Sequence, residues 1–352
     1  MTEKTVYFLG AGATKAVAEN APLNKDLVRK ALKDFPDEPA AKNIKAFISR
    51  LFLKRKDPPI DNQIWNLLDY VIQQNRAASP EYSLEKIREL REGLLGLVIR
   101  EFQKSLANPE GATYAKFAVA TQRSPSAIIS TNYDILMDNA LAEVSSYDYG
   151  PKVRYAVSSE VVKVRGMKKP NKGGIVTEDN VNTGNVPLLK IHGSLNWLYC
   201  RKCDEVDVSI RTKGIKDALT GLYCCDDRCT NKYEPLLITP TMFKNYENRF
   251  VEEVWQRASE ELRDAKRVVF IGYALKDEDY QIRCLLMNAL LNREKSYAEV
   301  IVIEQEKEQE DEADKKKEQT RLQEIETKYR DLYGSVTFRK DGFKKFVDAL
   351  PT

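Results

Sequence analysis

The chain has 352 residues, of which 42% are hydrophobic and 31% charged, a composition that supports a packed core and excludes general disorder. The 56 Lys and Arg against 53 Asp and Glu leave a formal charge of +3, so direct nucleic-acid binding is not expected. No apolar run reaches the roughly 18–20 residues that cross a bilayer, and residues 1–4 lead into a predicted strand without a cleavable signal. We therefore expect a cytoplasmic protein without membrane contact.

The first predicted strand, Thr5–Leu9, is followed by a glycine turn, Gly10–Thr14, and by a predicted helix, Lys15–Asn20. This order is typical of the start of a nucleotide-binding α/β domain, because glycines let the backbone approach a diphosphate. An ordinary tight turn is the structural alternative. Position 15 is Lys where a dinucleotide fingerprint needs its third glycine, and no acidic strand end follows about 20 residues later. A hydride-transferring dehydrogenase is therefore disfavoured.

Residues 23–107 are predicted to be mostly helical. Their apolar residues recur at helical spacing, for example at Ile64, Leu67, Leu68 and Val71. A helical stretch of this length between two strands predicts an inserted helical layer instead of a normal crossover.

Polar residues follow the next two predicted strands. Ala127–Ser130 leads into Thr131-Asn132-Tyr133-Asp134, and Leu188–Ile191 leads into His192, the only histidine. Ligands of open parallel sheets bind at the carboxyl ends of strands, and imidazole suits proton transfer near neutral pH. The structural alternatives are helix capping by Asn132 or Asp134 and a histidine that only packs.

The cysteines gather in one segment. All but Cys284 lie between Cys200 and Cys229, and a reducing compartment favours a metal site over disulfides. The predicted zinc ligands are Cys200, Cys203, Cys225 and Cys229, with Cys224 possible in place of Cys225. Four thiolates leave no open position, so the zinc would be structural. The alternatives are free thiols and a zinc ribbon that reads nucleic acid, although the basic, aromatic-rich flank of such a reader is missing.

The remaining elements complete an α/β domain. Pro235–Pro240 returns to the core, the amphipathic segment Phe250–Lys266 predicts a helix, and the charge-dense segment 304–330 predicts a solvated helix. Further strands are expected at Val268–Gly272, Val300–Ile303 and Ser335–Phe338, and further helices at Ile135–Val144, Ile282–Leu291 and Phe343–Leu350. The predicted fold is a Rossmann-like parallel sheet with helices on both faces. Its predicted parts are the main domain at 1–22 and 108–352, the helical insertion at 23–107 and a small zinc-ribbon-like module at 198–234.

The order of glycine turn, strand-end Asn and Asp, strand-end His and cysteine module resembles the sirtuin superfamily over nearly the whole chain. The resemblance implies that Gly10–Thr14 binds the pyrophosphate of NAD+. It also implies that Asn132 meets the nicotinamide ribose, Asp134 the carboxamide and His192, as the catalytic histidine, the ribose hydroxyls. The implied NAD-binding residues are Gly10, Ala11, Gly12, Ala13, Thr14, Thr131, Gly193, Gly272, Tyr273 and Glu304.

Other stretches depart from the protein-deacylating sirtuins. The loop after the glycine turn reads Asn20-Ala21-Pro22-Leu23-Asn24 in place of Gly-Ile-Pro-Asp-Phe-Arg, and Pro240-Thr241-Met242-Phe243-Lys244 stands where deacylases have Phe-Gly-Glu. Ser130–Asp134, Lys190–Leu198 and Ile271–Asp279 are instead similar to bacterial sirtuin-like NAD hydrolases of anti-phage defence.

This resemblance implies an NAD+ glycohydrolase that releases nicotinamide and linear or cyclic ADP-ribose. Because unregulated NAD loss would kill a cell, it also implies gating by a homo-oligomer or by a partner such as a HerA-type ATPase, an Argonaute-type protein or a phage component. The alternatives are an NAD-dependent protein-lysine deacylase, a non-catalytic NAD or ADP-ribose sensing subunit, and a zinc-dependent nucleic-acid adaptor.

Overall fold

The computed structural model describes residues 3–23, 26–53, 55, 58, 60–144, 147–151, 153, 156–172, 186–209, 221–239, 248–277 and 279–351. The chain divides into two compact units. The sheet unit comprises Met1–Val17, Glu110–Leu237 and Tyr246–Thr352, and the helical unit comprises Ala18–Pro109 and Ile238–Asn245. The domain boundaries expected from the sequence stay predictions.

A seven-stranded parallel sheet forms the centre of the sheet unit, in the order β12-β11-β10-β1-β2-β6-β3. Its strands are β1 (Thr5–Leu9), β2 (Ser126–Ser130), β3 (Tyr147–Asp148), β6 (Val186–Lys190), β10 (Arg267–Ile271), β11 (Glu299–Ile303) and β12 (Thr337–Arg339). β1 is buried along its whole length, as expected for a central strand covered on both faces. The chain places β2 and β6 on one side of β1 and β10 and β11 on the other, so the strand order reverses at β1.

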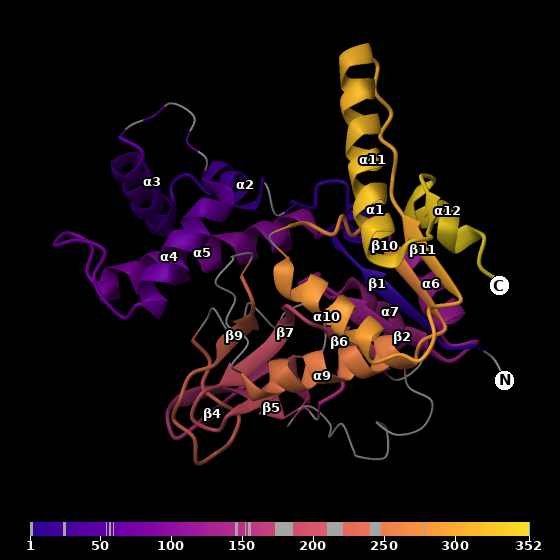
Figure 1. The fold of residues 1–352 in the computed structure, drawn as a ribbon. Helices are drawn as coiled ribbons and strands as arrows, with labels where there is room; N and C mark the ends of the chain where they lie inside the picture. The colour runs from indigo at the N-terminus through magenta and orange to yellow at the C-terminus, as the bar shows by residue number, and fades with distance from the viewer. Residues whose placement is uncertain are drawn as a thin grey trace. The chain divides into compact units, whose positions relative to one another are not determined.

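Two groups of helices cover opposite faces of this sheet, as predicted (Figure 1). In one group α9 contacts α10, and in the other α1 contacts α12, α12 contacts α6, and α6 contacts α7. Their bounds are α1 (Ala11–Val17), α6 (Ala112–Thr121), α7 (Leu136–Val144), α9 (Arg249–Asp264), α10 (Tyr280–Leu291) and α12 (Gly342–Asp348). The charge-dense segment near the C-terminus forms α11 (Glu312–Tyr333), which contacts β11.

Helix α9 shows how the sequence sets these elements. Asn248 Oδ1 accepts hydrogen bonds from the backbone N–H groups of Phe250 and Val251, which caps the start of the helix. Val254, Ala258 and other apolar residues at helical spacing are buried on one side. The predicted helix is therefore present and packs its apolar face inward.

A second, five-stranded sheet also belongs to the sheet unit, in the order β5-β4-β8-β7-β9. Its strands are β4 (Ala156–Val164), β5 (Met167–Lys172), β7 (Gly193–Cys200), β8 (Glu205–Ser209) and β9 (Glu234–Leu237). The predicted return to the core after the cysteines runs through this sheet, because β9 pairs antiparallel with β7 and not with a strand of the larger sheet.

The helical unit is organised around its longest helix, α5 (Leu84–Ser105). In the part of this unit that the structure describes, α2 (Leu27–Asp34), α3 (Pro39–Leu51) and α4 (Asp61–Gln73) each pack against α5. Ser83 caps α5 by accepting a hydrogen bond from the backbone N–H of Lys86. The apolar positions that predicted a helix at Ile64–Val71 lie on α4.

None of the helices in the described ranges is both long enough and apolar enough to cross a membrane.

Candidate functional site

The polar strand ends predicted from the sequence lie side by side. β2 pairs with β6, and Ser130 at the end of β2 is in register with Lys190 at the end of β6. Asn132 and Asp134 follow the first of these strands and His192 follows the second, and all three side chains are buried. The parallel register therefore brings the two loops to one point on the carboxyl edge of the sheet.

Asn132 connects its own loop to the glycine turn. Its Nδ2 donates to the backbone oxygen of Gly10, at 2.9 Å, and to Oγ1 of Thr14, at 3.0 Å. The Thr14 hydroxyl donates in turn to Oδ2 of Asp134, at 2.6 Å. One hydrogen-bonded chain thus fixes the ends of β1 and β2 relative to each other.

Asp134 also has the capping role that the sequence left open. Its Oδ1 accepts a hydrogen bond from the backbone N–H of Leu136, the first residue of α7, at 3.0 Å. Capping and participation in the strand-end cluster are therefore properties of the same carboxylate. Thr131 ties the loop to β1 independently, because its backbone N–H donates to the backbone oxygen of Leu9 at 3.0 Å.

The glycine turn is shorter than expected and has a packing role of its own. Helix α1 begins at Ala11, where the sequence predicted a helix from Lys15. A Cβ on Gly10 would lie 2.5 Å from the oxygen of Gly272, and a Cβ on Gly12 would lie 2.7 Å from the Cα of Gly272. Both glycines are thus needed for the contact between the ends of β1 and β10, whatever ligand binds there.

His192 sits between two anchored neighbours. The Trp255 indole N–H donates to the backbone oxygen of Ile191 at 2.8 Å, which attaches the loop to α9. Gly193 has φ of 81°, and a Cβ there would lie 2.1 Å from the oxygen of Leu236. The ring of Tyr133 lies 6.4 Å from the imidazole, centroid to centroid. This backbone conformation and the close approach of Leu236 require glycine at position 193. The Trp255 hydrogen bond and the packing of Gly193 hold the imidazole beside the loop that carries Asn132.

A buried polar network behind the two loops was not predicted from the sequence. Lys190 Nζ donates to the backbone oxygen of Asp134 and forms an ion pair with Asp138 at 3.0 Å. Tyr149 donates to the other oxygen of Asp138, and Asn196 Nδ2 donates to the Tyr149 hydroxyl at 3.0 Å. Burial raises the pKa of Tyr149 well above its usual value, so its phenol remains a donor.

Two sequence signals could have found this network. Lys190 interrupts an otherwise apolar strand, and a buried lysine needs an anionic partner. Asp138 lies in the first turn of the helix predicted to follow β2, close to the strand end that carries Asp134. The network links the loop after β2 to Lys190 at the end of β6, the strand that His192 follows. It therefore fixes the two loops of the site relative to each other.

The other predicted NAD contacts lie on the far side of β1. Gly272 and Tyr273 follow β10, and the Tyr273 hydroxyl donates to Asp279 at 3.1 Å. Glu304 follows β11, is buried and forms an ion pair with Arg321 at 3.3 Å. Burial raises the pKa of Glu304, and Arg321 opposes this shift. These residues share the carboxyl edge with Asn132 and His192 but come from the strands beyond β1.

Four cysteine sulfurs form a compact group. The Sγ atoms of Cys200, Cys203, Cys224 and Cys229 all lie within 4.8 Å of one another. The Cys200–Cys229 and Cys203–Cys224 sulfur distances are 3.6 and 3.8 Å. A tetrahedral Zn²⁺ with Zn–S bonds of about 2.3 Å has sulfurs about 3.8 Å apart, so this set fits structural zinc.

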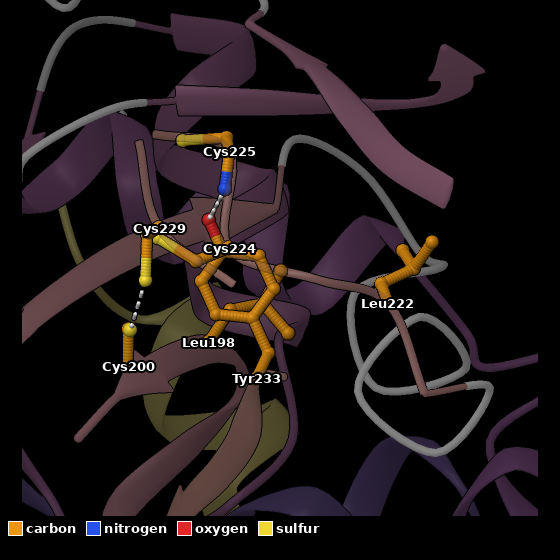
Figure 2. Packing of buried hydrophobic residues seen from close by; sticks show 7 residues of the cluster. All are labelled: Leu198, Cys200, Leu222, Cys224, Cys225, Cys229 and Tyr233. Carbon is orange, nitrogen blue, oxygen red and sulfur yellow. Dashed lines mark hydrogen bonds between the residues drawn. The ribbon is translucent and has the colours of Figure 1, made fainter. Parts of the chain in front are cut away.

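Cys225, the ligand first chosen from the sequence, lies outside the group, and its alternative Cys224 lies inside it. Cys225 Sγ is 3.4 Å from a carboxylate oxygen of buried Asp207. Figure 2 shows that the backbone N–H of Cys225 donates to the Tyr233 hydroxyl, at 2.9 Å. Tyr233 donates to the same Asp207 oxygen. The spacing in the sequence alone could not say which of the two adjacent cysteines joins the group.

Comparison with known proteins gives one family. The model of the SIR2-like domain matches residues 126–329. No curated protein matches the chain. Similar solved structures include a Sir2–p53 peptide–NAD+ complex, at 11% identity and a TM-score of 0.43, covering 99% of this chain and 91% of that one. Another is Sir2Tm bound to a propionylated peptide, at 10% identity and a TM-score of 0.40, with the same shares covered.

Similarity at that level bears on neither the substrate nor the individual residues of this chain. The family match is different in kind, because it spans more than half of the sequence and includes the loops that carry Asn132, Asp134 and His192. The chain belongs to the SIR2-like domain family.

Proposed function

We propose that the protein is an NAD+ glycohydrolase that cleaves the bond between nicotinamide and ribose. The observation that carries the proposal is the arrangement of Asn132, Asp134 and His192 after two adjacent strands, with Asn132 and Asp134 hydrogen-bonded to the glycine turn after β1. The amide oxygen of Asn132, the carboxylate of Asp134 and the imidazole of His192 provide a hydrogen-bond acceptor, an anion and a proton acceptor at one edge, because both N–H bonds of Asn132 already donate to Gly10 and Thr14. Family membership supports NAD+ as the substrate.

The chemistry needs little from the protein beyond charge and position. The C–N bond breaks with its electron pair going to nicotinamide, which leaves as a neutral base, and the ribose acquires oxocarbenium character. Nearby anions and fixed dipoles stabilise that positive charge. His192 accepts a proton from a ribose hydroxyl or polarises it, and Asn132 positions the ribose or the water that supplies the new oxygen. The products are nicotinamide, ADP-ribose and a proton.

The dinucleotide would lie along the carboxyl edge of the sheet. Gly10–Thr14 would bind the diphosphate, with Gly272, Tyr273 and Glu304 on the adenosine side. The Asn132–Gly10 hydrogen bond then couples the diphosphate end of the site to the nicotinamide end. Zn²⁺ at Cys200, Cys203, Cys224 and Cys229 would stabilise the smaller sheet and would take no part in the reaction.

Hydrolysis is favoured over deacylation by the sequence around the site. The departure at Asn20–Asn24 removes residues on which the deacylating sirtuins rely. The stretch at 240–244, which also departs, lies outside the described residues. A role in bacterial anti-phage defence, with gating by a partner such as a HerA-type ATPase, belongs to the same proposal.

The deciding experiment compares NAD+ consumption with and without an acetylated peptide. Nicotinamide release that is independent of peptide, with ADP-ribose as co-product, supports the glycohydrolase. Release that requires peptide, accompanied by deacetylated peptide, makes the protein a deacylase and overturns the proposal. Calorimetric NAD+ binding without any product, both for the chain alone and after addition of a HerA-type ATPase, identifies a sensing subunit and overturns it as well.

A further inference from the structure

Helix α10 presents an apolar stripe to solvent. Tyr280, Met287 and Leu291 are 68%, 57% and 82% exposed, and Cys284 between them is exposed too. Successive intervals of four, three and four residues place these side chains on one face of the helix. The opposite face is buried, and α10 packs there against α9. We call the exposed set, Tyr280, Cys284, Met287 and Leu291, the α10 stripe.

The spacing of the stripe is the same in both directions along the helix. If two α10 helices lie antiparallel about a twofold axis between Cys284 and Met287, Tyr280 faces Leu291 of the second copy. Cys284 then faces Met287, so a short side chain meets a long, flexible one. A twofold interface requires this self-complementarity, because the same patch serves both partners.

The charge pattern also permits self-association. The exposed polar neighbours of the stripe on α10, Asn288 and Asn292, are uncharged. Arg283 bonds within its own chain, to the Leu275 backbone oxygen at 3.0 Å and to Asp277 at 2.9 Å. The helix itself therefore brings no like charges together when it meets its own copy.

We propose that the α10 stripe binds the α10 stripe of a second copy, giving an antiparallel, twofold dimer. The inference rests on the stripe and is independent of the reaction. A single helix per copy makes a small contact compared with stable interfaces, which bury about 800 Å² on each partner. We therefore expect a dimer that dissociates at roughly micromolar concentrations.

The test uses charge reversal across the axis in the full chain. Tyr280→Glu and Leu291→Lys each place a charge opposite an apolar side chain, and each should raise the dissociation constant at least tenfold. In the double variant, Glu at 280 faces Lys at 291 of the second copy, so association should recover to within about threefold of the unchanged chain. Intramolecular pairing cannot explain recovery, because eleven residues of helix separate the positions by about 16 Å.

These substitutions should leave the helix intact. An acidic residue at the first position of a helix and a basic residue at its last both interact favourably with the helix dipole. Val119→Glu, an apolar-to-acidic change at an exposed position of α6, is the matched control and should leave association unchanged.

Sedimentation velocity across a concentration series reads out the assembly, and thermal melting checks the folding of each variant. Three results would overturn the proposal: a monomer at the highest concentration, a dimer indifferent to both single variants, or a double variant no better than the weaker single one.

Discussion

The side-chain Nδ2 of Asn132 donates a hydrogen bond to the backbone oxygen of Gly10 over 2.9 Å. This contact joins residues 122 positions apart and holds the end of β2 against the turn after β1. It makes the amide of Asn132 a structural element of the proposed site as well as a candidate ligand for ribose. Changes at Asn132 should therefore alter stability even without NAD+.

Asn132→Asp should lower the free energy of unfolding by about 1–3 kcal/mol, because a carboxylate oxygen would face the Gly10 oxygen where a donor stood. Urea denaturation measures the effect. Gln319→Glu, an amide-to-carboxylate change at an exposed position on α11, should cost well under 0.5 kcal/mol by comparison, the range of ordinary surface substitutions. Equal stability of Asn132→Asp and the unchanged chain would contradict the hydrogen-bonded chain described for this site.

Lys190→Met should destabilise the protein by about 3–5 kcal/mol, because it leaves the buried carboxylate of Asp138 without its cation. Adding Asp138→Asn should recover at least half of that loss, since a neutral amide can still accept from Tyr149. Lys116→Met breaks an exposed pair with Asp348 and should have a far smaller effect, because solvent screens exposed ion pairs. Unfolding experiments that find additive losses in the double variant would argue against a coupled pair.

Cys224→Ser and Cys225→Ser separate the zinc ligand from its neighbour. The first should abolish stoichiometric zinc binding and lower the melting temperature, because metal binding and folding are coupled. The second should retain the zinc of the unchanged chain, because Cys225 lies outside the four-cysteine group and contacts Asp207 instead. Metal analysis of the purified variants decides between them, and zinc retained by Cys224→Ser but lost from Cys225→Ser would reverse the assignment.

Glu304→Gln should stabilise the fold at neutral pH and weaken NAD+ binding. Burial raises the pKa of Glu304 above its ordinary value of 4.5, so the folded state favours the protonated carboxyl. That contribution is complete below a pH of about 4.5 and is lost as the pH rises through the raised pKa. The gain in melting temperature from Glu304→Gln should therefore be present at about pH 7.5 and vanish near pH 4. A gain that grows on acidification would show the opposite sign.

The central strands were predictable because both faces of the sheet are covered. Apolar runs such as Thr5–Leu9 and Val300–Ile303 have few alternatives to buried strands, and polar residues after them had to meet at one edge. The partners of those residues could not be predicted. The two members of the Lys190–Asp138 pair are 52 positions apart in the sequence. Cys224 and Cys225 are neighbours of the same type, and only the path of the folded backbone directs the Cys224 side chain into the sulfur group.

The early start of helix α1 was also not predicted, because its cause is a contact with a distant segment of the chain. The glycines at positions 10 and 12 were interpreted as a loop for a ligand, whereas they let the turn pack against Gly272 of a distant segment. A glycine in the sequence indicates close approach, but it does not say to what.

Nicotinamide release by the unchanged chain and by His192→Ala tests the proposed chemistry most directly. General acid–base catalysis contributes roughly 10²–10⁴-fold, so we expect release from NAD+ to fall at least about a hundredfold in His192→Ala. Gln319→Ala, at an exposed position on α11, is the control and should retain full turnover. The account is contradicted if folded His192→Ala releases nicotinamide as fast as the unchanged chain.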